Sequence, residues 1–362
     1  MFEGVWKESL DEEQEHRFPL LLWEDQLVRS VVVIHQGALG DFILALPSFE
    51  TIRKTFPRAK LVIIGYPRIV ELVDQRFYVG KILSIDQKEM ASLFVRGGPL
   101  DPNLSQLFGQ FDLIVLFGRD EDGTIIENLE SVCHGKILHI HPFPSWGREI
   151  HLTDHLLRQF SRYGFLISCS TPRLYLKESD RDWGRRFWQG KGVNIEERSR
   201  AIILHPGSGS KRKVWPLERF LSLSQILRDR LGSKILIILG PAEETEMERV
   251  FGEMDPQAFI QAKGFSLLQI ASLMEKCRAF IGNDSGISHM ASALGIPTIA
   301  IFGPTDPGVW APRGEKVLVV RRETPCSPCT RERLLQCGDL ECLKGIGTEE
   351  VLKGLEKVGV ST

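Results

Sequence analysis

The stretch from Cys277 to Gly314 constrains this chain most strongly, because it alternates strand, loop, helix, strand and loop in close succession. A short apolar run at residues 278–282 predicts a strand, and Asn-Asp-Ser-Gly at 283–286 turns the chain. Helical spacing follows over 287–294, closed by a glycine and a proline, before a second apolar strand at 298–302. This alternation predicts parallel strands joined by a helix.

Two loops of this stretch are candidates for an anion site. Asp284 or Ser285 occupies the expected N-cap position of the helix that follows Gly286 and includes His289, so free N–H groups should face the loop. Those donors and the helix dipole favour an anion. The second strand ends in a stiff Gly-Pro-Thr-Asp-Pro loop that contains Thr305, at the edge where open α/β sheets bind ligands. A capped helix and a glycine-proline turn also need no ligand, and that reading stays open.

Buried strands and helices alternate along most of the chain. The segment Ile34-His35-Gln36-Gly37 is echoed 170 residues later by Leu204-His205-Pro206-Gly207, so each half opens with a strand that feeds a glycine loop. We therefore predict an α/β protein with two Rossmann-like, doubly wound parallel sheets facing a cleft. The expected strands of the first half are 30–34, 60–64, 81–85, 111–117 and 136–140, and those of the second half are 201–204, 234–239, 259–261, 278–282, 298–302 and 317–320.

The predicted domain organisation has five parts. They are an accessory N-terminal extension at 1–29, an N-terminal domain at 30–176, a connector at 177–200, a C-terminal domain at 201–347 and a final helix at 348–362.

Composition narrows the function classes. The 362 residues are 43% hydrophobic and 25% charged, which is typical of a soluble globular protein. A net charge of −2 provides no overall basic field to recruit nucleic acid. The apolar runs are too short to span a bilayer, and the acidic residues 1–29 do not resemble a signal peptide, so we expect a cytoplasmic protein.

The first glycine loop, Gly-Ala-Leu-Gly-Asp at 37–41, offers Asp41 as a candidate catalytic carboxylate. Two residues separate Gly37 and Gly40, so the loop is not the G-x-G-x-x-G fingerprint, and a dinucleotide-dependent oxidoreductase loses support. On capping statistics alone, Asp41 is the N-cap of a helix that runs from about 42 to 56.

The second glycine loop, at 205–216, places three basic residues just after a Gly/Ser turn. Backbone N–H groups, the Ser208 hydroxyl and the Lys213 ammonium would suit a diphosphate. A solvated surface turn explains the same residues about equally well.

Four cysteines fall within seventeen residues near the C-terminus, at Cys326, Cys329, Cys337 and Cys342. The spacing is compatible with a tetrahedral zinc site of structural type. Free thiols or disulfides are the alternatives, and a cytosolic compartment disfavours disulfides.

The motifs together resemble one family. Asp-Ser-Gly-x-x-His at 284–289, Phe-Gly-Pro-Thr-Asp-Pro at 302–307 and Gly-Ala-Leu-Gly-Asp at 37–41 are similar to the signature of the ADP-heptose:lipopolysaccharide heptosyltransferases, glycosyltransferase family 9. The resemblance covers roughly residues 31–358 and implies the glycosyltransferase B fold, with a terminal helix that often returns to the first domain.

The resemblance also implies roles for residues. Asp41 would be the catalytic base, and Lys213 would act in both catalysis and donor binding. The family often has Arg or Lys where His35 stands, and some members have a ribose-binding acid near Gln261. The remaining donor-binding residues would be Ser208, Asp284, Ser285, Gly286, His289 and Thr305.

The implied function is inverting transfer of heptose from ADP-heptose to the lipid A–core acceptor of lipopolysaccharide, at the inner face of the inner membrane. We expect no Asp-x-Asp metal–diphosphate motif in the chain, and therefore catalysis without a metal cofactor. Another nucleotide sugar or acceptor, a sugar-nucleotide epimerase or hydrolase, and a non-catalytic nucleotide-binding protein are the alternatives. Five basic residues are candidate contacts for the anionic acceptor: Arg53, Lys54, Arg58, Lys60 and Arg68. A solvated helix face explains these five almost as well.

Overall fold

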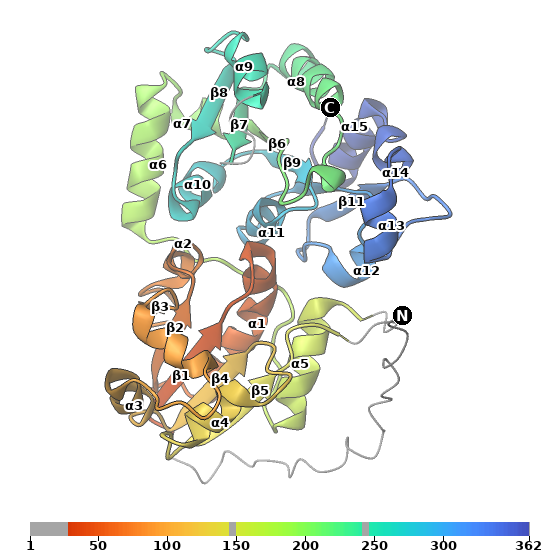
Figure 1. Cartoon of the computed structure of the whole chain (residues 1–362). Coiled ribbons are helices and arrows are strands. Elements are labelled where there is room, and N and C mark those ends of the chain that lie inside the picture. The colour runs from red at the N-terminus through yellow and green to blue at the C-terminus, as the bar shows by residue number, and fades with distance from the viewer. Residues whose placement is uncertain (1–27, 145–149, 241–245, 362) are drawn as a thin grey trace.

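The computed structural model describes residues 28–144, 150–240 and 246–361. Two parallel sheets lie in separate lobes, each covered by helices on both faces (Figure 1). The two doubly wound α/β domains predicted from the sequence are confirmed. The predicted N-terminal extension lies outside the described residues except for Val28 and Arg29.

The first sheet has the order β3-β2-β1-β4-β5, with all strands parallel. Strand β1 is central because its β-branched run Val31–Ile34 is buried on both faces. The strands are β1 (Ser30–His35), β2 (Lys60–Gly65), β3 (Lys81–Ser84), β4 (Leu113–Phe117) and β5 (Lys136–Ile140). The helices are α1 (Leu39–Thr55), α2 (Pro67–Val70), η2 (Glu71–Val73), η3 (Lys88–Phe94), α3 (Pro102–Phe108), α4 (Thr124–Glu130) and α5 (Leu152–Arg162).

The second sheet has the order β11-β10-β9-β6-β7-β8 and is also parallel. Its strands are β6 (Ile202–His205), β7 (Ile235–Leu239), β8 (Phe259–Lys263), β9 (Ala279–Asn283), β10 (Thr298–Phe302) and β11 (Val317–Arg321). Its helices are α6 (Glu178–Gly190), α7 (Ile195–Arg198), η4 (Lys211–Lys213), α8 (Leu217–Leu231), α9 (Glu246–Gly252), α10 (Leu267–Met274), α11 (Gly286–Ala293), α12 (Pro307–Trp310), α13 (Arg331–Gln336), α14 (Glu341–Lys344) and α15 (Thr348–Lys357). The echoed residues His35 and His205 each end the central strand that begins their lobe.

Helix α6 occupies much of the segment expected to be a connector. A Cβ atom on Gly184 would lie 2.6 Å from the Ser272 carbonyl oxygen, so α6 and α10 pack closely. The buried Trp188 donates its Nε1–H to the Leu273 carbonyl at 3.3 Å. Helix α6 is therefore part of the helical layer of the second lobe.

The final helix, α15, packs on β10 and β11 of the second sheet. Gly354 faces the side chains of Ile299 and Leu318, and Val351 and Leu355 are buried in the same core. The expectation that this helix returns to the first domain is wrong for this chain, because its apolar face is used up within its own lobe.

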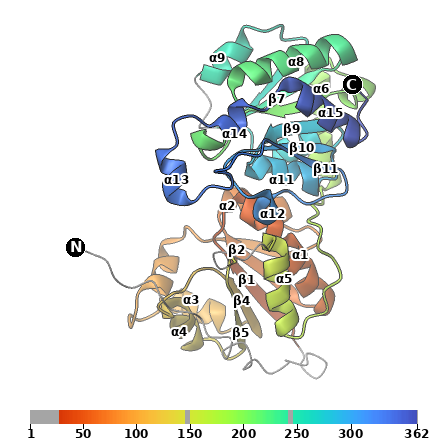
Figure 2. The same cartoon turned by 90° about the vertical axis from the view of Figure 1, so that its right-hand side faces the viewer.

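The lobes meet where α11 lies above the N-terminal end of α1 (Figures 1 and 2). A bidentate ion pair between Arg313 and Asp154 also joins them, with Nη1 2.7 Å from Oδ1. His151 Nε2 lies 2.9 Å from the Ala311 carbonyl oxygen beside it. No helix in the described segments is both long and apolar enough to cross a lipid bilayer.

Candidate functional site

Three loops of the second lobe converge because they follow adjacent strands. Strands β6, β9 and β10 are parallel neighbours, so the segments after His205, Asn283 and Phe302 all leave the sheet from the carboxyl ends of these strands. This is the carboxyl edge, where open α/β sheets bind ligands.

Asn283 ties two of these loops together. Its side chain is fully buried, its Oδ1 accepts the Trp215 backbone N–H at 2.9 Å, and its Nδ2 donates to the Pro206 carbonyl at 2.8 Å. The sequence analysis missed this residue, although an amide at the end of a buried strand is a usable signal because it must find partners. Asn283 therefore holds the 205–216 loop in place.

Ser208 and Lys213 both contact Asp284. The Ser208 hydroxyl donates to the Asp284 carbonyl oxygen at 2.8 Å. Lys213 Nζ lies 2.8 Å from Asp284 Oδ2, and the carboxylate is buried while the lysine is about one-third exposed. The structure thus brings together three residues that were expected to bind the donor.

The N-terminus of α11 presents free donors. Ser285 is the N-cap, but its hydroxyl makes no capping bond and instead lies 3.3 Å from the Ser288 hydroxyl. Gly286 is the first residue of α11, and because it has no side chain it does not cover the backbone amides of this turn. The amide groups of this turn are therefore not occupied by the Ser285 side chain, as an anion site requires.

His289 lies on the same helix and is 95% buried. Burial lowers its pKa to about 4, so the imidazole is neutral near pH 7. Its Nδ1 has no hydrogen-bond partner among the described residues. Since buried polar atoms are normally paired, this nitrogen is left with unused hydrogen-bonding capacity inside the protein.

The loop that contains Thr305 follows β10, beside the α11 N-terminus. Thr305 is partly buried, and Asp306 caps α12 by accepting the Gly308 N–H at 2.8 Å. Gln261, by contrast, lies in the middle of edge strand β8, where it pairs with Ile237. It therefore does not lie in any of the three converging loops.

Asp41 faces these loops from the first lobe. Helix α1 begins at Leu39, so Asp41 is its third residue and the prediction that Asp41 is the N-cap is wrong. Its Oδ2 accepts the Ala38 N–H at 3.2 Å. Burial raises the pKa of the Asp41 carboxyl, and the Ala38 N–H and the charge of Lys213 oppose that rise.

The two glycine motifs touch directly across the lobes. A Cβ atom on Gly40 would lie 3.2 Å from Cδ2 of His289, and one on Gly286 would lie 2.7 Å from Cβ of Leu39. A side chain on Gly286 would clash with Leu39, and one on Gly40 would crowd His289, so the N-terminal turns of α1 and α11 meet closely. This contact places Asp41 and the donor loops in one site.

Most of the basic residues expected to bind the acceptor lie elsewhere. Arg53 is at the C-terminal end of α1, where its guanidinium donates to the carbonyls of Ala59 and Tyr78. Lys54 pairs with Glu50 at 2.7 Å at the same end of α1. The cleft-side candidates are Arg68 on α2 and Arg119, which follows β4 and lies 5.2 Å from the ring centre of Phe143.

The chain contains two Asp-x-Asp sequences, at 120–122 and 180–182, so the expectation that it has none is wrong. Asp120 accepts the amide hydrogens of Ile125 and Ile126, and Asp122 accepts that of Thr124, so both cap α4. Asp180 pairs with Arg76 at 2.5 Å. Asp182 pairs with Arg185. All four carboxylates thus have structural partners.

The segment that contains the four cysteines is hydrogen-bonded to two of the donor loops. Arg212, next to Lys213, donates to the Cys337 carbonyl at 2.6 Å, and the Cys329 N–H donates to the Pro304 carbonyl at 2.8 Å. Burial and the neighbouring thiols raise the pKa values of Cys329 and Cys342. In the described ranges, no three His, Cys, Asp or Glu side chains are grouped tightly enough to hold one ion. The four-thiolate zinc site remains a prediction.

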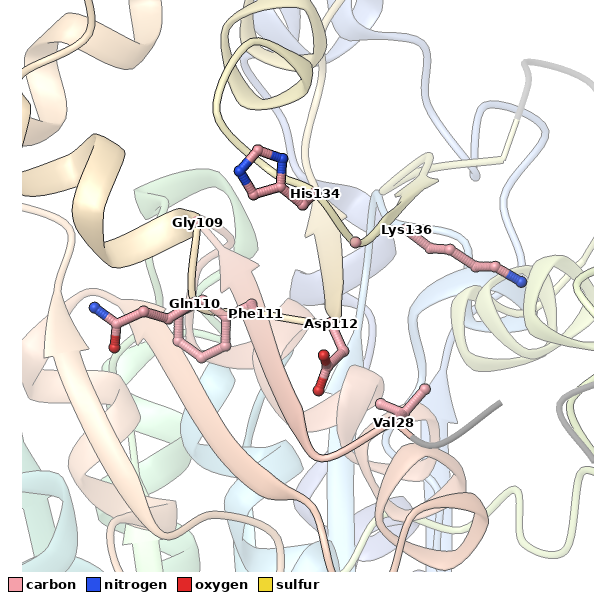
Figure 3. A pocket seen from close by; sticks show the side chains of 8 residues that line it. Val28, Gly109, Gln110, Phe111, Asp112, His134 and Lys136 are labelled. Atoms are coloured by element: carbon pink, nitrogen blue, oxygen red, sulfur yellow. The ribbon is translucent and has the colours of Figure 1, made fainter. Parts of the chain in front are cut away.

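A surface hollow of about 380 Å³ lies at the opposite edge of the first sheet (Figure 3). It is formed at the amino ends of β1, β4 and β5, away from the glycine motifs. Its carboxylate, Asp112, already accepts the Arg29 and Ser30 amide hydrogens at 2.8 and 2.9 Å. The hollow is therefore not part of the candidate site.

Comparison with known proteins supports the same family. The chain is 30% identical to lipopolysaccharide heptosyltransferase 1 of Pseudomonas aeruginosa over 132 residues, which is 36% of each chain. It thus matches only about a third of that relative's length.

Two solved structures share the fold. A glycosyl transferase family 9 protein from Veillonella parvula superposes with a TM-score of 0.74 at 20% identity, covering 92% of this chain and 98% of that one. The E. coli ADP-heptose LPS heptosyltransferase II gives a TM-score of 0.68 at 17% identity, covering 91% and 98%. At these identities the two likenesses show that this chain shares their fold.

A family model adds the decisive match. The model of glycosyltransferase family 9 (heptosyltransferase) matches residues 153–337, more than half of the chain and all three donor loops. The chain therefore belongs to glycosyltransferase family 9, the heptosyltransferase family.

Proposed function

We propose that this protein is an inverting glycosyltransferase that moves heptose from ADP-heptose to the inner core of lipopolysaccharide. The observation that carries the proposal is the meeting of Asp41 with the donor loops at the contact between α1 and α11. A partly desolvated carboxylate thereby lies opposite a lysine and a helix N-terminus. The names of relatives and the solved heptosyltransferase support the donor and the acceptor class.

In the proposed mechanism, Asp41 accepts the proton of the acceptor hydroxyl as that oxygen attacks the anomeric carbon. The new C–O bond forms while the bond from the anomeric carbon to the diphosphate oxygen breaks, and its electron pair leaves with ADP. Lys213 and the amides at the start of α11 stabilise the negative charge that grows on ADP. Attack from the face opposite the leaving group inverts the anomeric centre.

The donor diphosphate would lie between the 205–216 loop and the α11 N-terminus. Ser208, Ser285, Gly286 and His289 would contact the diphosphate there, and Thr305 would approach it from the next loop. We assign Asp284 a different task from direct phosphate binding, because its carboxylate would repel a diphosphate and is already paired with Lys213.

The acceptor would bind along the carboxyl edge of the first sheet. Arg119 and Arg68 are the cations on this side that suit the phosphates and acidic sugars of a core oligosaccharide. Since that acceptor is carried by lipid A, the protein would work at the cytoplasmic face of the inner membrane, in peripheral contact with it.

We also propose that the four-cysteine segment holds one structural metal ion, with zinc as the candidate. Burial and then the neighbouring thiols raise the pKa values of Cys329 and Cys342, and a cation bound by Cys326, Cys329, Cys337 and Cys342 would favour the thiolates. No catalytic task is assigned to this ion.

The decisive experiment incubates the purified protein with ADP-heptose, with and without core acceptor. Formation of heptosylated acceptor and ADP in equal amounts supports transfer. Release of free heptose or an altered ADP-sugar without acceptor indicates a hydrolase or an epimerase, and ADP binding without turnover indicates a non-catalytic protein. Mass spectrometry of core oligosaccharide from cells that lack the protein tests the cellular role, because the missing mass identifies the sugar added.

A further inference from the structure

His35 is a buried titratable residue that the proposed mechanism does not use. It ends β1 and is only 5% exposed. Three aromatic rings surround it, with centroids at 5.3 Å for Phe42, 6.1 Å for Phe49 and 5.6 Å for Phe117. This apolar cage lowers the pKa of His35 to about 4, so the imidazole carries no charge near pH 7.

One hydrogen bond fixes the tautomer of this ring. His35 Nδ1 accepts the Gly37 backbone N–H at 3.2 Å, so in the neutral ring the proton is on Nε2. A neutral imidazole of such low basicity, with its Nδ1 already occupied, is a poor proton acceptor. His35 is therefore not a substitute for Asp41 as the base.

His35 and Asp41 both lie against Gly37, in the space that a side chain at this position would need. A Cβ atom on Gly37 would lie 2.6 Å from Cε1 of His35 and 2.8 Å from Cβ of Asp41. The Gly37 amide is held by His35, and the Ala38 amide is held by Asp41. In the turn between β1 and α1, the amides of Gly37 and Ala38 are thus each hydrogen-bonded to one side chain.

We propose that His35 is the positioning residue of Asp41: a neutral imidazole that holds the Gly37 turn and so aims the carboxylate at the contact between the lobes. The inference rests on the proposed role of Asp41 as the base. The titratable or charged groups around the turn are Asp41 itself and, from the second lobe, Lys213 and His289. The rings from α1 and β4 that pack on His35 carry no charge.

The neutral state of His35 has a consequence for Asp41. A permanent cation in this place would favour the ionised carboxylate and make it a weaker base. Such a cation also has no lone pair with which to accept the Gly37 N–H, whereas the neutral imidazole accepts it and leaves the Asp41 carboxylate without that electrostatic effect. Position 35 thereby sets both the aim and the basicity of the catalytic carboxylate.

Three variants of the full chain test the proposal: His35→Asn, His35→Leu and His35→Arg. Asparagine places an acceptor oxygen near the position of Nδ1, leucine removes the acceptor at similar size, and arginine adds a fixed charge. We expect His35→Leu to lower kcat by about 10- to 100-fold with ADP affinity unchanged, and His35→Asn to restore most of it. In His35→Arg, the acid limb of the kcat/KM profile should move to lower pH by about one unit or more.

Calorimetric titration with ADP and thermal unfolding confirm that each variant is folded. A purely structural role for His35 predicts that asparagine and leucine are equally damaging and that the acid limb stays in place, and either result overturns the proposal. If His35→Arg does not fold, the comparison of asparagine with leucine decides alone. The variant Asp41→Asn tests the proposed base separately from the role of His35. If Asp41→Asn keeps its turnover, Asp41 is not the base, whatever the His35 variants show.

Discussion

Lys213 and Asp284 form an ion pair across two loops, with Nζ 2.8 Å from Oδ2. The carboxylate is buried, so it holds the lysine at the edge of the sheet where the donor is proposed to bind. The pair explains how a flexible lysine can be pre-organised, since Asp284 fixes its position before any diphosphate arrives.

This pair leads to a graded prediction. Lys213→Ala should weaken ADP binding and raise the barrier to transfer by about 2–4 kcal/mol, the scale for losing one charged donor to the leaving group. Asp284→Asn should have a smaller effect on kcat/KM, because the lysine remains but loses its orientation. Lys211→Ala, an exposed lysine on the same turn, is the matched control. Equal kinetics for Lys211→Ala and Lys213→Ala would place Lys213 outside the donor site.

Asp41→Asn should abolish most turnover while leaving ADP affinity nearly intact. The amide oxygen can still accept the Ala38 N–H, so the start of α1 should survive. The amide cannot accept a proton, and loss of a general base typically costs about 10²–10⁴-fold in rate. Asp101→Asn, which alters the N-cap of α3, controls for a capping effect on stability. Retention of more than about a tenth of wild-type kcat would show that Asp41 is not the essential base.

The pH dependence of the reaction should reflect the environment of Asp41. Because burial raises the pKa of this carboxyl, the base stays protonated to a higher pH than an ordinary aspartate. Activity should therefore rise with pH through that raised pKa, and the acid limb of kcat/KM should lie above the usual range of aspartate. An acid limb at or below pH 4 would contradict a desolvated base.

Stability should fall in mild acid because of two buried histidines. Burial lowers the pKa values of His35 and His289 to about 4 in the folded protein, below the usual histidine value of 6.5. Between pH 4 and 6.5 these histidines bind more protons in the unfolded chain than in the folded protein. The free energy of unfolding therefore decreases as the pH falls from about 6.5 to 4. Each histidine should cost about 2 kcal/mol at pH 5 relative to pH 8. Urea unfolding of the wild type and His289→Gln at both pH values measures this. The exposed His134→Gln is the control. A pH dependence that His289→Gln leaves unchanged would rule out this source.

Turnover should not require a divalent ion, since the proposed charge partners of the diphosphate are a lysine and helix amides. Assay in excess EDTA is the test, and protein integrity is checked by thermal unfolding because of the cysteine segment. Activity lost in EDTA and restored by Mg²⁺, with the fold intact, would contradict the prediction.

The cysteine segment should hold about one zinc ion per chain. Elemental analysis of protein purified without chelator measures it, and Cys326→Ser should lower the metal content. Because Arg212 and Cys329 connect this segment to the donor loops, loss of metal should also weaken ADP binding. Cys133→Ser, in the first lobe, is the control. Four freely titrating thiols without metal would refute the site.

The sequence by itself determined the architecture and the order of the motifs. Apolar runs such as 30–34 and 298–302 can only be buried on both faces, and the glycine loops that follow them mark the carboxyl ends of strands. Pattern and loop chemistry are local properties, so Asp41, Lys213 and the Asp284–His289 turn could be identified without coordinates. Family resemblance supplied their proposed roles, which the local pattern could not.

Tertiary structure alone decided which groups meet. The start of α1 at Leu39, the pairing of Lys213 with Asp284 and the support of the donor loops by Asn283 depend on contacts between segments far apart in sequence. Arg53 seemed suited to an acceptor because it is basic, yet the direction of α1 points it away from the cleft and onto backbone carbonyls. The uncharged state of His35 likewise comes from three phenylalanine rings brought together by α1 and β4, because burial of a charge depends on the whole environment and not on neighbours in the chain.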